Sequence, residues 1–315
     1  MADVSEPADE FSFLPAQAAE AGLDVPIPPG ERLRLELADG RVLSALRYGG
    51  HSPAVTFLHG AGLNAHTWDT TILALGLPAL AIDLPGHGDS SWRDDMAYVA
   101  RTLAPDVATG VDAWTDRPQL LVGHSLGGLT AAALAAARPD LVRELVVIDI
   151  TPGIDPDGGA AQLREFFAGP TDWADRDELV ARALAFGLGG SPEAAARGVY
   201  FNSRVRPDGR VEWKHHFAHL ANAMAADPAA ADAMGAAQDA MRALLIGTGW
   251  EDLAAVRAPI TLIRGERGYV TDADAADFAA RVPQASVLSV PSGHNVQEEL
   301  PADLGRRLAA LARTR

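Results

Sequence analysis

The sequence contains no cysteine, which excludes disulfides, thiolate metal ligands and a cysteine nucleophile. It also lacks any run of about 18 apolar residues, the length that a membrane-spanning helix needs. Basic residues are outnumbered, 26 against 42 acidic ones, and the net charge of −16 disfavours binding to nucleic acid and to anionic membranes. We therefore expect a small molecule as the partner. Residues 1–10 carry no apolar segment typical of a signal peptide, so we expect a cytoplasmic protein.

What is present is an alternation of short apolar segments with helix-like ones. Residues 32–37 alternate with period two, and 42–48 read as the returning strand of a hairpin. Helical patterns then separate most of six apolar runs, which lie at 54–58, 80–82, 120–122, 145–148, 260–263 and 287–290. Short buried strands alternating with helices predict an α/β fold with a mostly parallel eight-stranded sheet and helices on both faces.

One long interval interrupts this alternation. Residues 151–249 contain no strand pattern and read as several helices. An insertion of this size at the carboxyl edge of the sheet would lie over the crevice there, so we expect a helical cap. The domain division is then an N-terminal arm at 1–30, an α/β core at 31–150 and 250–315, and the cap at 151–249.

Aromatic side chains near this crevice are candidates for contact with a substrate. Phe166 and Trp213 fall in the expected cap, and Trp68 begins a helix near the mouth of the crevice. We name these three as the expected substrate-binding residues, although burial in the core explains Trp68 equally well.

The most informative motif is residues 123–127, Gly-His-Ser-Leu-Gly. A strand-like segment precedes it and a helix-like segment follows it, and a strand, a sharp turn and a helix with serine at the apex form a nucleophile elbow. Small residues two positions on either side of the serine let strand and helix approach each other. The helix N-terminus below the serine offers partial positive charge to a developing oxyanion. Ser125 is the predicted nucleophile.

A serine hydroxyl needs a base within hydrogen-bonding reach. His294 lies in the loop 291–295, directly after the last expected strand, and this loop returns to the sheet edge that carries Ser125. His294 is therefore the predicted base. The remaining histidines have weaker claims; three of them could form a metal pair on a helix but lack acidic or cysteine partners, so we expect no metal: His215, His216 and His219.

The acid that orients the base has three candidates. Asp149 ends a strand that we expect next to the one carrying Ser125, so its carboxylate can reach the same crevice. Glu266 and Asp272 lie after the strand 260–263, where the loop has glycine and tyrosine in place of an aspartate. We favour Asp149, and leave open Glu266, Asp272 or no acid at all.

The loop 59–62, His-Gly-Ala-Gly, follows the strand 54–58 and completes the set. Its small residues allow a backbone N–H to point into the crevice. The N–H groups of Ala61 and Leu126 would then form a two-donor oxyanion hole. His59 is expected to brace the loop rather than to react.

With these residues identified, the chain resembles the α/β-hydrolase superfamily, in its capped, cofactor-free serine branch. The resemblance implies Ser125 as nucleophile, His294 as base, Ala61 and Leu126 as oxyanion donors, and no cofactor. The chain departs from the family in the loop after the seventh strand, which lacks the usual aspartate; Asp149 fits members with the acid after the sixth strand. The segments that carry the resemblance are, in the family's order, 57–62, 83–88, 122–128 and 293–294.

We therefore expect a serine hydrolase that cleaves a carboxylic ester or lactone through an acyl-enzyme. Dehalogenases and epoxide hydrolases of this fold use an aspartate at the elbow, and Ser125 is not one. Two alternatives stay open. The first is a hydrolase of the same fold that cleaves a carbon–carbon bond next to a ketone, and the second is a non-catalytic module that binds a small molecule.

Overall fold

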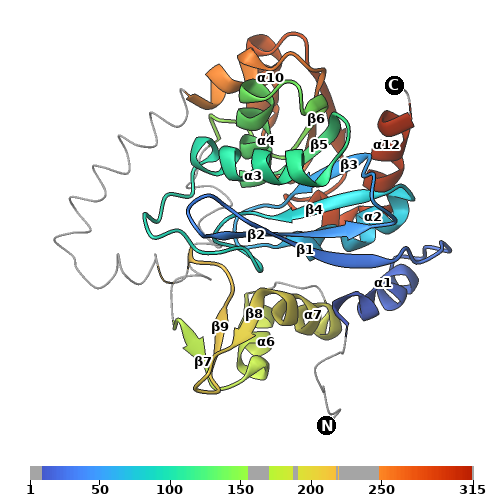
Figure 1. Ribbon diagram of the computed structural model, residues 1–315. Helices are drawn as coiled ribbons and strands as arrows, with labels where there is room; N and C mark the ends of the chain where they lie inside the picture. The colour runs from blue at the N-terminus through green and yellow to red at the C-terminus, as the bar shows by residue number, and fades with distance from the viewer. Residues whose placement is uncertain (1–8, 155–169, 187–190, 218, 220–247, 314–315) are drawn as a thin grey trace.

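The computed structural model describes residues 9–154, 170–186, 191–217, 219 and 248–313, and its centre is one large sheet (Figure 1). The strands of this sheet are β1 (Gly30–Glu36), β2 (Val42–Tyr48), β3 (Val55–Leu58), β4 (Ala79–Asp83), β5 (Gln119–His124), β6 (Val142–Ile148), β10 (Ile260–Gly265) and β11 (Ser286–Val290). They follow the order β1-β2-β4-β3-β5-β6-β10-β11. β2 pairs antiparallel with β1 and β4, and the other neighbours are parallel. The predicted eight-stranded, mostly parallel sheet is confirmed.

Helices cover both faces of this sheet, as Figure 1 shows. Alternate residues of β4 face opposite cores, with Leu80 and Ile82 in one and Ala79 and Ala81 in the other. The core that contains Leu80 and Ile82 is covered by α3 (Ala100–Trp114), α4 (Leu126–Ala137) and α10 (Asp272–Arg281), and the other by α1 (Leu14–Glu20), α2 (Asp69–Leu75) and α12 (Pro301–Arg313).

Among the described residues, no helix is long and apolar enough to span a bilayer.

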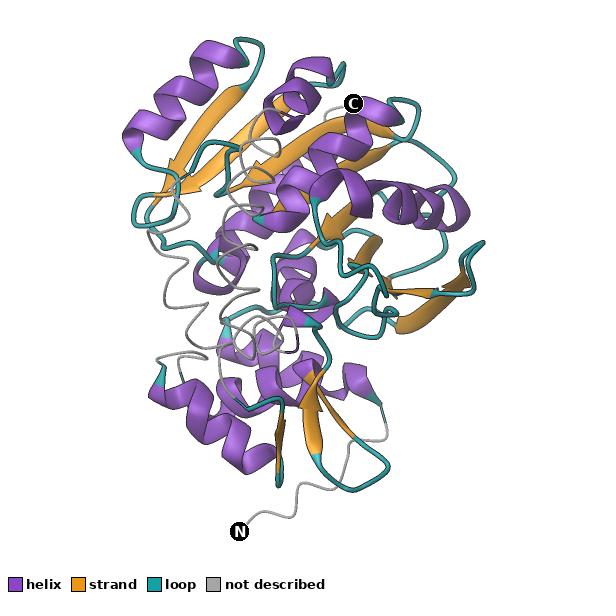
Figure 2. Ribbon diagram, turned by 90° about the vertical axis from the view of Figure 1, so that its left-hand side faces the viewer, coloured by secondary structure: helices purple, strands orange, loops and turns teal. Residues whose placement is uncertain are grey.

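The described part of the insertion forms a small body of its own, seen at the bottom of Figure 2. Two helices agree with the expected helical cap, but the structure adds an antiparallel sheet that the sequence analysis did not anticipate. The rings of Trp173 and Trp213 meet edge to face at 5.5 Å in the core of this body, where Leu179 is also buried. Its elements are α6 (Arg176–Ala185), α7 (Pro192–Asn202), β7 (Asp172–Trp173), β8 (Ser203–Val205) and β9 (Val211–Trp213).

The N-terminal segment packs between the core and the cap. It consists of the 3-10 helix η1 (Glu10–Phe13) and α1, and Figure 1 shows α1 beside α7. The ring of Phe13 lies 5.3 Å from that of Phe201 in α7. Glu20 of α1 pairs with Arg197 of α7 at 2.8 Å. The segment therefore joins the two bodies through both apolar and charged contacts.

The insertion contacts the core again just after β9. Lys214 Nζ lies 3.1 Å from the Asp89 carboxylate, and the Lys214 carbonyl accepts a hydrogen bond from Trp92 Nε1 at 2.6 Å. His216 stacks on Trp92 with ring centroids 4.3 Å apart, and its N–H donates to the Gly86 carbonyl at 2.9 Å. This histidine therefore helps to hold the cap on the core.

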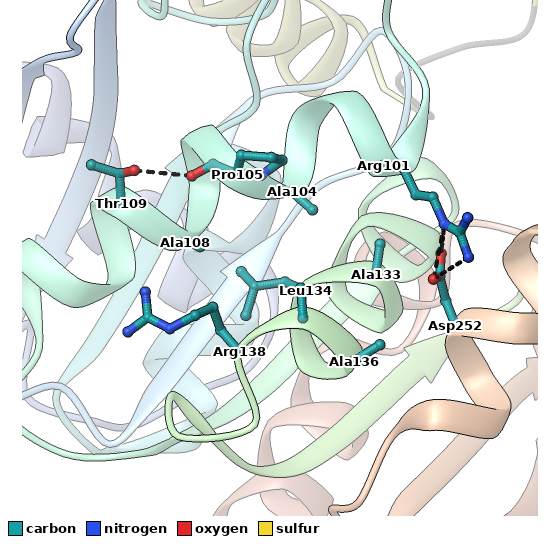
Figure 3. A pocket seen from close by; sticks show the side chains of 11 residues that line it. Arg101, Ala104, Pro105, Ala108, Thr109, Ala133, Leu134, Ala136, Arg138 and Asp252 are labelled. Atoms are coloured by element: carbon teal, nitrogen blue, oxygen red, sulfur yellow. Dashed lines mark hydrogen bonds and ion pairs between the residues drawn. The ribbon is translucent and has the colours of Figure 1, made fainter.

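A groove of about 630 Å³ lies between α3 and α4 (Figure 3). Figure 3 shows Arg101 and Asp252 paired at one end of the groove, with a hydrogen bond of 3.0 Å. Alanines and Leu134 form much of the lining. None of the predicted site residues lines the groove, so it is separate from the chemistry predicted at the elbow.

Candidate active site

Ser125 occupies a tight turn between β5 and α4. Its backbone has φ 51° and ψ −122°, in the left-handed region that costs a residue with a side chain about 1–3 kcal/mol. A Cβ atom on Gly123 would lie 2.3 Å from the Gly127 carbonyl oxygen, and one on Gly127 would lie 2.4 Å from that of Leu58. The turn therefore has the close contacts of a nucleophile elbow, and both glycines are required by them.

The two expected oxyanion donors, Ala61 and Leu126, come from two different elements. Leu126 is the first residue of α4, so its N–H has no acceptor within the helix and lies at the positive end of the helix dipole. Ala61 lies in the loop after β3. His59 braces this loop as predicted, because its Nε2 accepts from the Leu84 N–H at 2.9 Å and its Nδ1 donates to the Gly60 carbonyl at 2.8 Å. Burial lowers the pKa of His59, which keeps the ring neutral and able to accept.

The structure brings His294 to Asp149, 145 residues earlier in the chain. His294 Nδ1 lies 2.8 Å from Asp149 Oδ2, and the carboxylate is fully buried. Asp149 follows β6 and, like Ser125, has a positive φ, of 47°. Two further donors fix the carboxylate, the Gly265 N–H at 3.0 Å and the Tyr269 N–H at 2.6 Å. A buried carboxylate with three donors is a satisfied anion that can hold one tautomer of His294.

The other two candidate acids lie elsewhere. Glu266 is exposed, and no hydrogen bond joins its carboxylate to His294 among the described residues. Asp272 begins α10 and forms an ion pair with Arg264. The loop that lacks an aspartate is instead shaped around Asp149, because a Cβ on Gly268 would lie 2.2 Å from Asp149 Oδ2.

His124 links the elbow to the loop that carries His294. Its Nε2 donates to the His294 carbonyl at 3.0 Å, and the two rings lie 4.5 Å apart. Burial, followed by the nearby His294, lowers the pKa of His124 well below its usual value, so the ring is a neutral donor. Among the described residues no hydrogen bond joins Ser125 Oγ to His294; in unliganded enzymes such bonds often tighten only when substrate binds.

The contacts made by Tyr269 and His124 were not expected from the sequence. The Tyr269 ring stacks on that of His294, with centroids 3.6 Å apart and planes 11° from parallel. The available signals were an aromatic residue in the loop without an aspartate and a histidine inside the pentad. Neither signal predicts a contact without the path of both loops in space.

Comparison with known proteins identifies the family. A family model described as "Alpha/beta hydrolase family" matches residues 57–307. The chain belongs to the α/β hydrolase family. It is 38% identical over 312 residues to esterase Rv0045c of Mycobacterium tuberculosis, an alignment that covers 94% of this chain and 93% of the relative. Similarity to a curated esterase over nearly the whole length indicates esterase activity for this α/β hydrolase.

A second relative and two solved structures extend the comparison. The chain is 29% identical to 2-(acetamidomethylene)succinate hydrolase of Mesorhizobium japonicum, over 83% of this chain and 88% of that one. A structure of the M. tuberculosis esterase Rv0045c superposes with a TM-score of 0.80 at 34% identity, covering 97% of this chain and 99% of the other. A structure of E-2-(acetamidomethylene)succinate hydrolase superposes with a TM-score of 0.73 at 23% identity, over 90% and 98%, which supports the fold alone.

Two of the three expected substrate-binding aromatics of this α/β hydrolase, Trp68 and Trp213, are buried instead. Trp68 has no exposed surface and packs on Phe57, with ring centroids 4.9 Å apart, so it belongs to the core. Trp213 is 4% exposed and packs inside the cap. Phe166 lies outside the described residues. Within those residues, no group of three or more acidic or histidine side chains is placed to hold a metal.

Proposed function

We propose that this α/β hydrolase is a serine esterase that cleaves a small carboxylic ester or lactone through an acyl-enzyme. The observation that supports this most directly is the 2.8 Å hydrogen bond between His294 Nδ1 and Asp149, formed at the loop that His124 ties to the elbow of Ser125. The identity of 38% with an esterase supports the same reaction class.

In the first half of the reaction, Ser125 Oγ attacks the carbonyl carbon of the ester. His294 takes the hydroxyl proton on Nε2, because Nδ1 already donates to Asp149. The carbonyl oxygen becomes an oxyanion and accepts hydrogen bonds from the N–H groups of Ala61 and Leu126. Removing one such donor typically costs ~3 kcal/mol of transition-state stabilisation.

Collapse of this intermediate breaks the bond to the alkoxide, which leaves with the proton held on His294 Nε2. In the second half, His294 removes a proton from water, and the resulting hydroxide attacks the acyl-enzyme carbonyl. The second tetrahedral intermediate expels Ser125 Oγ, which regains its proton from His294. Asp149 accepts the hydrogen bond from His294 Nδ1 and stabilises the imidazolium formed in each half.

We also propose the division into an arm at 1–30, a core at 31–150 and 250–315, and a cap at 151–249 that helps to select the substrate. The cap contacts the segment just after the oxyanion loop, because Asn64 Nδ2 donates to Asn202 Oδ1 at 2.7 Å. We propose, in addition, that the protein acts in the cytoplasm. Cell fractionation with an antibody tests this location.

The esterase proposal is tested with a series of p-nitrophenyl esters and lactones and with a fluorophosphonate probe. We expect wild-type turnover and a covalent adduct on Ser125, both lost in Ser125→Ala. Asp149→Asn should lower kcat by 10²-fold or more, because the amide carries no charge to stabilise the imidazolium and its NH2 group can donate to Nδ1, which favours the wrong tautomer of His294. Glu266→Gln, with an exposed side chain away from His294, is the matched control and should retain wild-type activity.

The same assays separate the alternatives. Labelling of Ser125 with turnover of a vinylogous diketone but not of esters would favour cleavage of a carbon–carbon bond. A folded protein that neither labels nor turns over any substrate would favour the binding module. An Asp149→Asn variant as active as wild type would remove Asp149 from the proposed mechanism.

A further inference from the structure

One face of the proposed base is covered by an aromatic ring. Tyr269 stacks on His294 with centroids 3.6 Å apart and an interplanar angle of 11°. The backbone N–H of Tyr269 donates at 2.6 Å to Asp149 Oδ2, the same oxygen that accepts from His294 Nδ1 at 2.8 Å. One residue therefore contacts both members of the buried acid–base pair, through its ring on one side and its backbone on the other.

The stacked ring has a chemical consequence, because His294 changes charge during the reaction. The face of an aromatic ring carries partial negative charge and attracts a cation held over it. The attraction is weak for neutral imidazole and stronger for the imidazolium that forms when Ser125 gives up its proton. An interaction that strengthens as the transition state forms raises kcat rather than lowering KM.

The phenol hydroxyl is not needed for this effect. Burial, followed by the Asp149 charge, raises the pKa of Tyr269 above its ordinary value, so the side chain is a neutral phenol in the working range of an esterase. The part of Tyr269 that meets His294 is the ring face. Phenylalanine would present the same face.

We propose that Tyr269 is a positioning residue for the His294–Asp149 pair, and that its ring favours the imidazolium form of His294 in the transition state. This inference rests on the proposed esterase function. It also gives a role to the loop in which the aspartate is missing. The loop Gly265–Val270 supplies two backbone donors and one ring to an acid that comes from β6.

The test varies the charge on the aromatic face at position 269 while keeping a ring of nearly the same shape there, and compares this with removal of the ring. Tyr269→Phe should keep kcat within about 2-fold of wild type, whereas Tyr269→Leu should lower kcat about 10-fold with little change in KM. Phenylalanines with one to five fluorine atoms, introduced at position 269 by codon suppression, should lower kcat stepwise because fluorine withdraws charge from the ring face. Glu266→Gln, from the same loop, serves as a control for changes at its surface and should match wild type.

Each outcome separates this inference from the proposed function. A kcat that is unchanged across the fluorinated series would overturn the electrostatic role, even if Tyr269→Leu fails to fold. A loss confined to KM would overturn it as well, since that result assigns the ring to substrate binding. A wild-type protein with neither ester turnover nor labelling of Ser125 would instead overturn the proposed function itself.

Discussion

At the scale of single residues, the buried carboxylate of Asp149 accounts for the unusual sequence around it. Three donors converge on its two oxygens, and the space that a side chain at position 268 would fill is taken by Oδ2. The glycine at 268 is therefore required by the acid and not by a special backbone conformation, because its φ is not positive.

Gly268→Ala should therefore impair the acid without unfolding the chain. The added methyl group would meet Asp149 Oδ2 at 2.2 Å and force the carboxylate or the loop to move. We expect kcat to fall about 10- to 100-fold, since misplacing a catalytic group by about 1 Å costs this much. Steady-state kinetics with a p-nitrophenyl ester measure the loss.

The matched control is Gly198→Ala in α7, where an added Cβ meets no atom within 4 Å. This change should leave kcat unaltered and raise stability slightly, by roughly 0.5–1 kcal/mol, because alanine favours the helix. If Gly268→Ala were as active as wild type, the close contact between the loop 265–270 and Asp149 would not be required for activity.

The main site positions could be predicted because the carboxyl ends of parallel strands lie at one edge of the sheet, here those of β6 and β11 on either side of β10. That rule brings Asp149 and His294 together from the positions of their strands alone, and the structure joins them at 2.8 Å. Tyr269 could not be assigned, since stacking depends on the path of two loops. The burial of Trp68 could not be predicted either, because it depends on packing against Phe57 of β3, and the positions of the two residues in the sequence do not indicate that contact.

At the scale of elements, the strands of the main sheet were predictable and those of the cap were not. Main-sheet strands have four to seven residues, and their sequences show either apolar runs or, in β1, alternation with period two. The cap strands have two or three residues, as in Asp172–Trp173, which is too short for periodicity to emerge. Their pairing is set by contacts within the cap, such as that between Trp173 and Trp213.

The N-terminal segment is the element that we expect to hold the cap in place. Phe13→Ala would remove ring contacts to Tyr200 and Phe201, and Phe201 itself stacks on His66 of the core at 3.7 Å. The loss should lower stability by about 1–3 kcal/mol and the melting temperature by roughly 2–6 °C. We also expect KM to rise and kcat to change little, because the proposed cap would close less well.

Calorimetry and steady-state kinetics measure both effects. Leu288→Ala, at a side chain 38% exposed on β11, is the control for loss of apolar surface away from the cap. An unchanged KM in Phe13→Ala, together with a lowered melting temperature, would limit the segment to a role in stability.

At the scale of the whole molecule, one charged cluster ties the arm, the sheet and the core helices together. His66 Nδ1 lies 3.0 Å from Asp69 Oδ2, and its Nε2 lies 3.0 Å from Glu10 Oε2. Burial alone would lower the pKa of His66, but the charge of Asp69 and hydrogen bonds to both carboxylates raise its pKa to about 9. Both ring nitrogens face acceptors, so the protonated form fits the site.

This cluster makes stability depend on pH in a defined direction. The pKa of His66 is higher in the folded protein than the ordinary value of about 6.5, so its contribution is complete below about pH 6.5 and is lost as pH rises through 9. Compared with His66→Gln, the wild type should lose at most about 3 kcal/mol of unfolding free energy between pH 6 and 10. Urea unfolding of both proteins at several pH values measures the difference.

The carboxylate of Glu10 makes stability depend on pH in the opposite direction. Burial would raise the pKa of Glu10, but hydrogen bonds to His66 and Arg32 lower it to about 2. Its contribution is therefore present above about pH 4.5 and is lost as pH falls through 2. If the unfolding free energy of wild type and of His66→Gln fell equally between pH 6 and 10, the loss of stability at alkaline pH could not be assigned to His66.

Lys214 is the only lysine among the 315 residues, since the other 25 of the 26 basic residues are arginines. Its side chain is 17% exposed, and its ammonium group pairs with Asp89 where the cap contacts the core just after β9. Within these 315 residues, an amine-reactive dye therefore has a single side chain to attach to, without any engineered cysteine. The rate of this acylation, followed by the dye's absorbance, measures how often the contact between Lys214 and Asp89 opens.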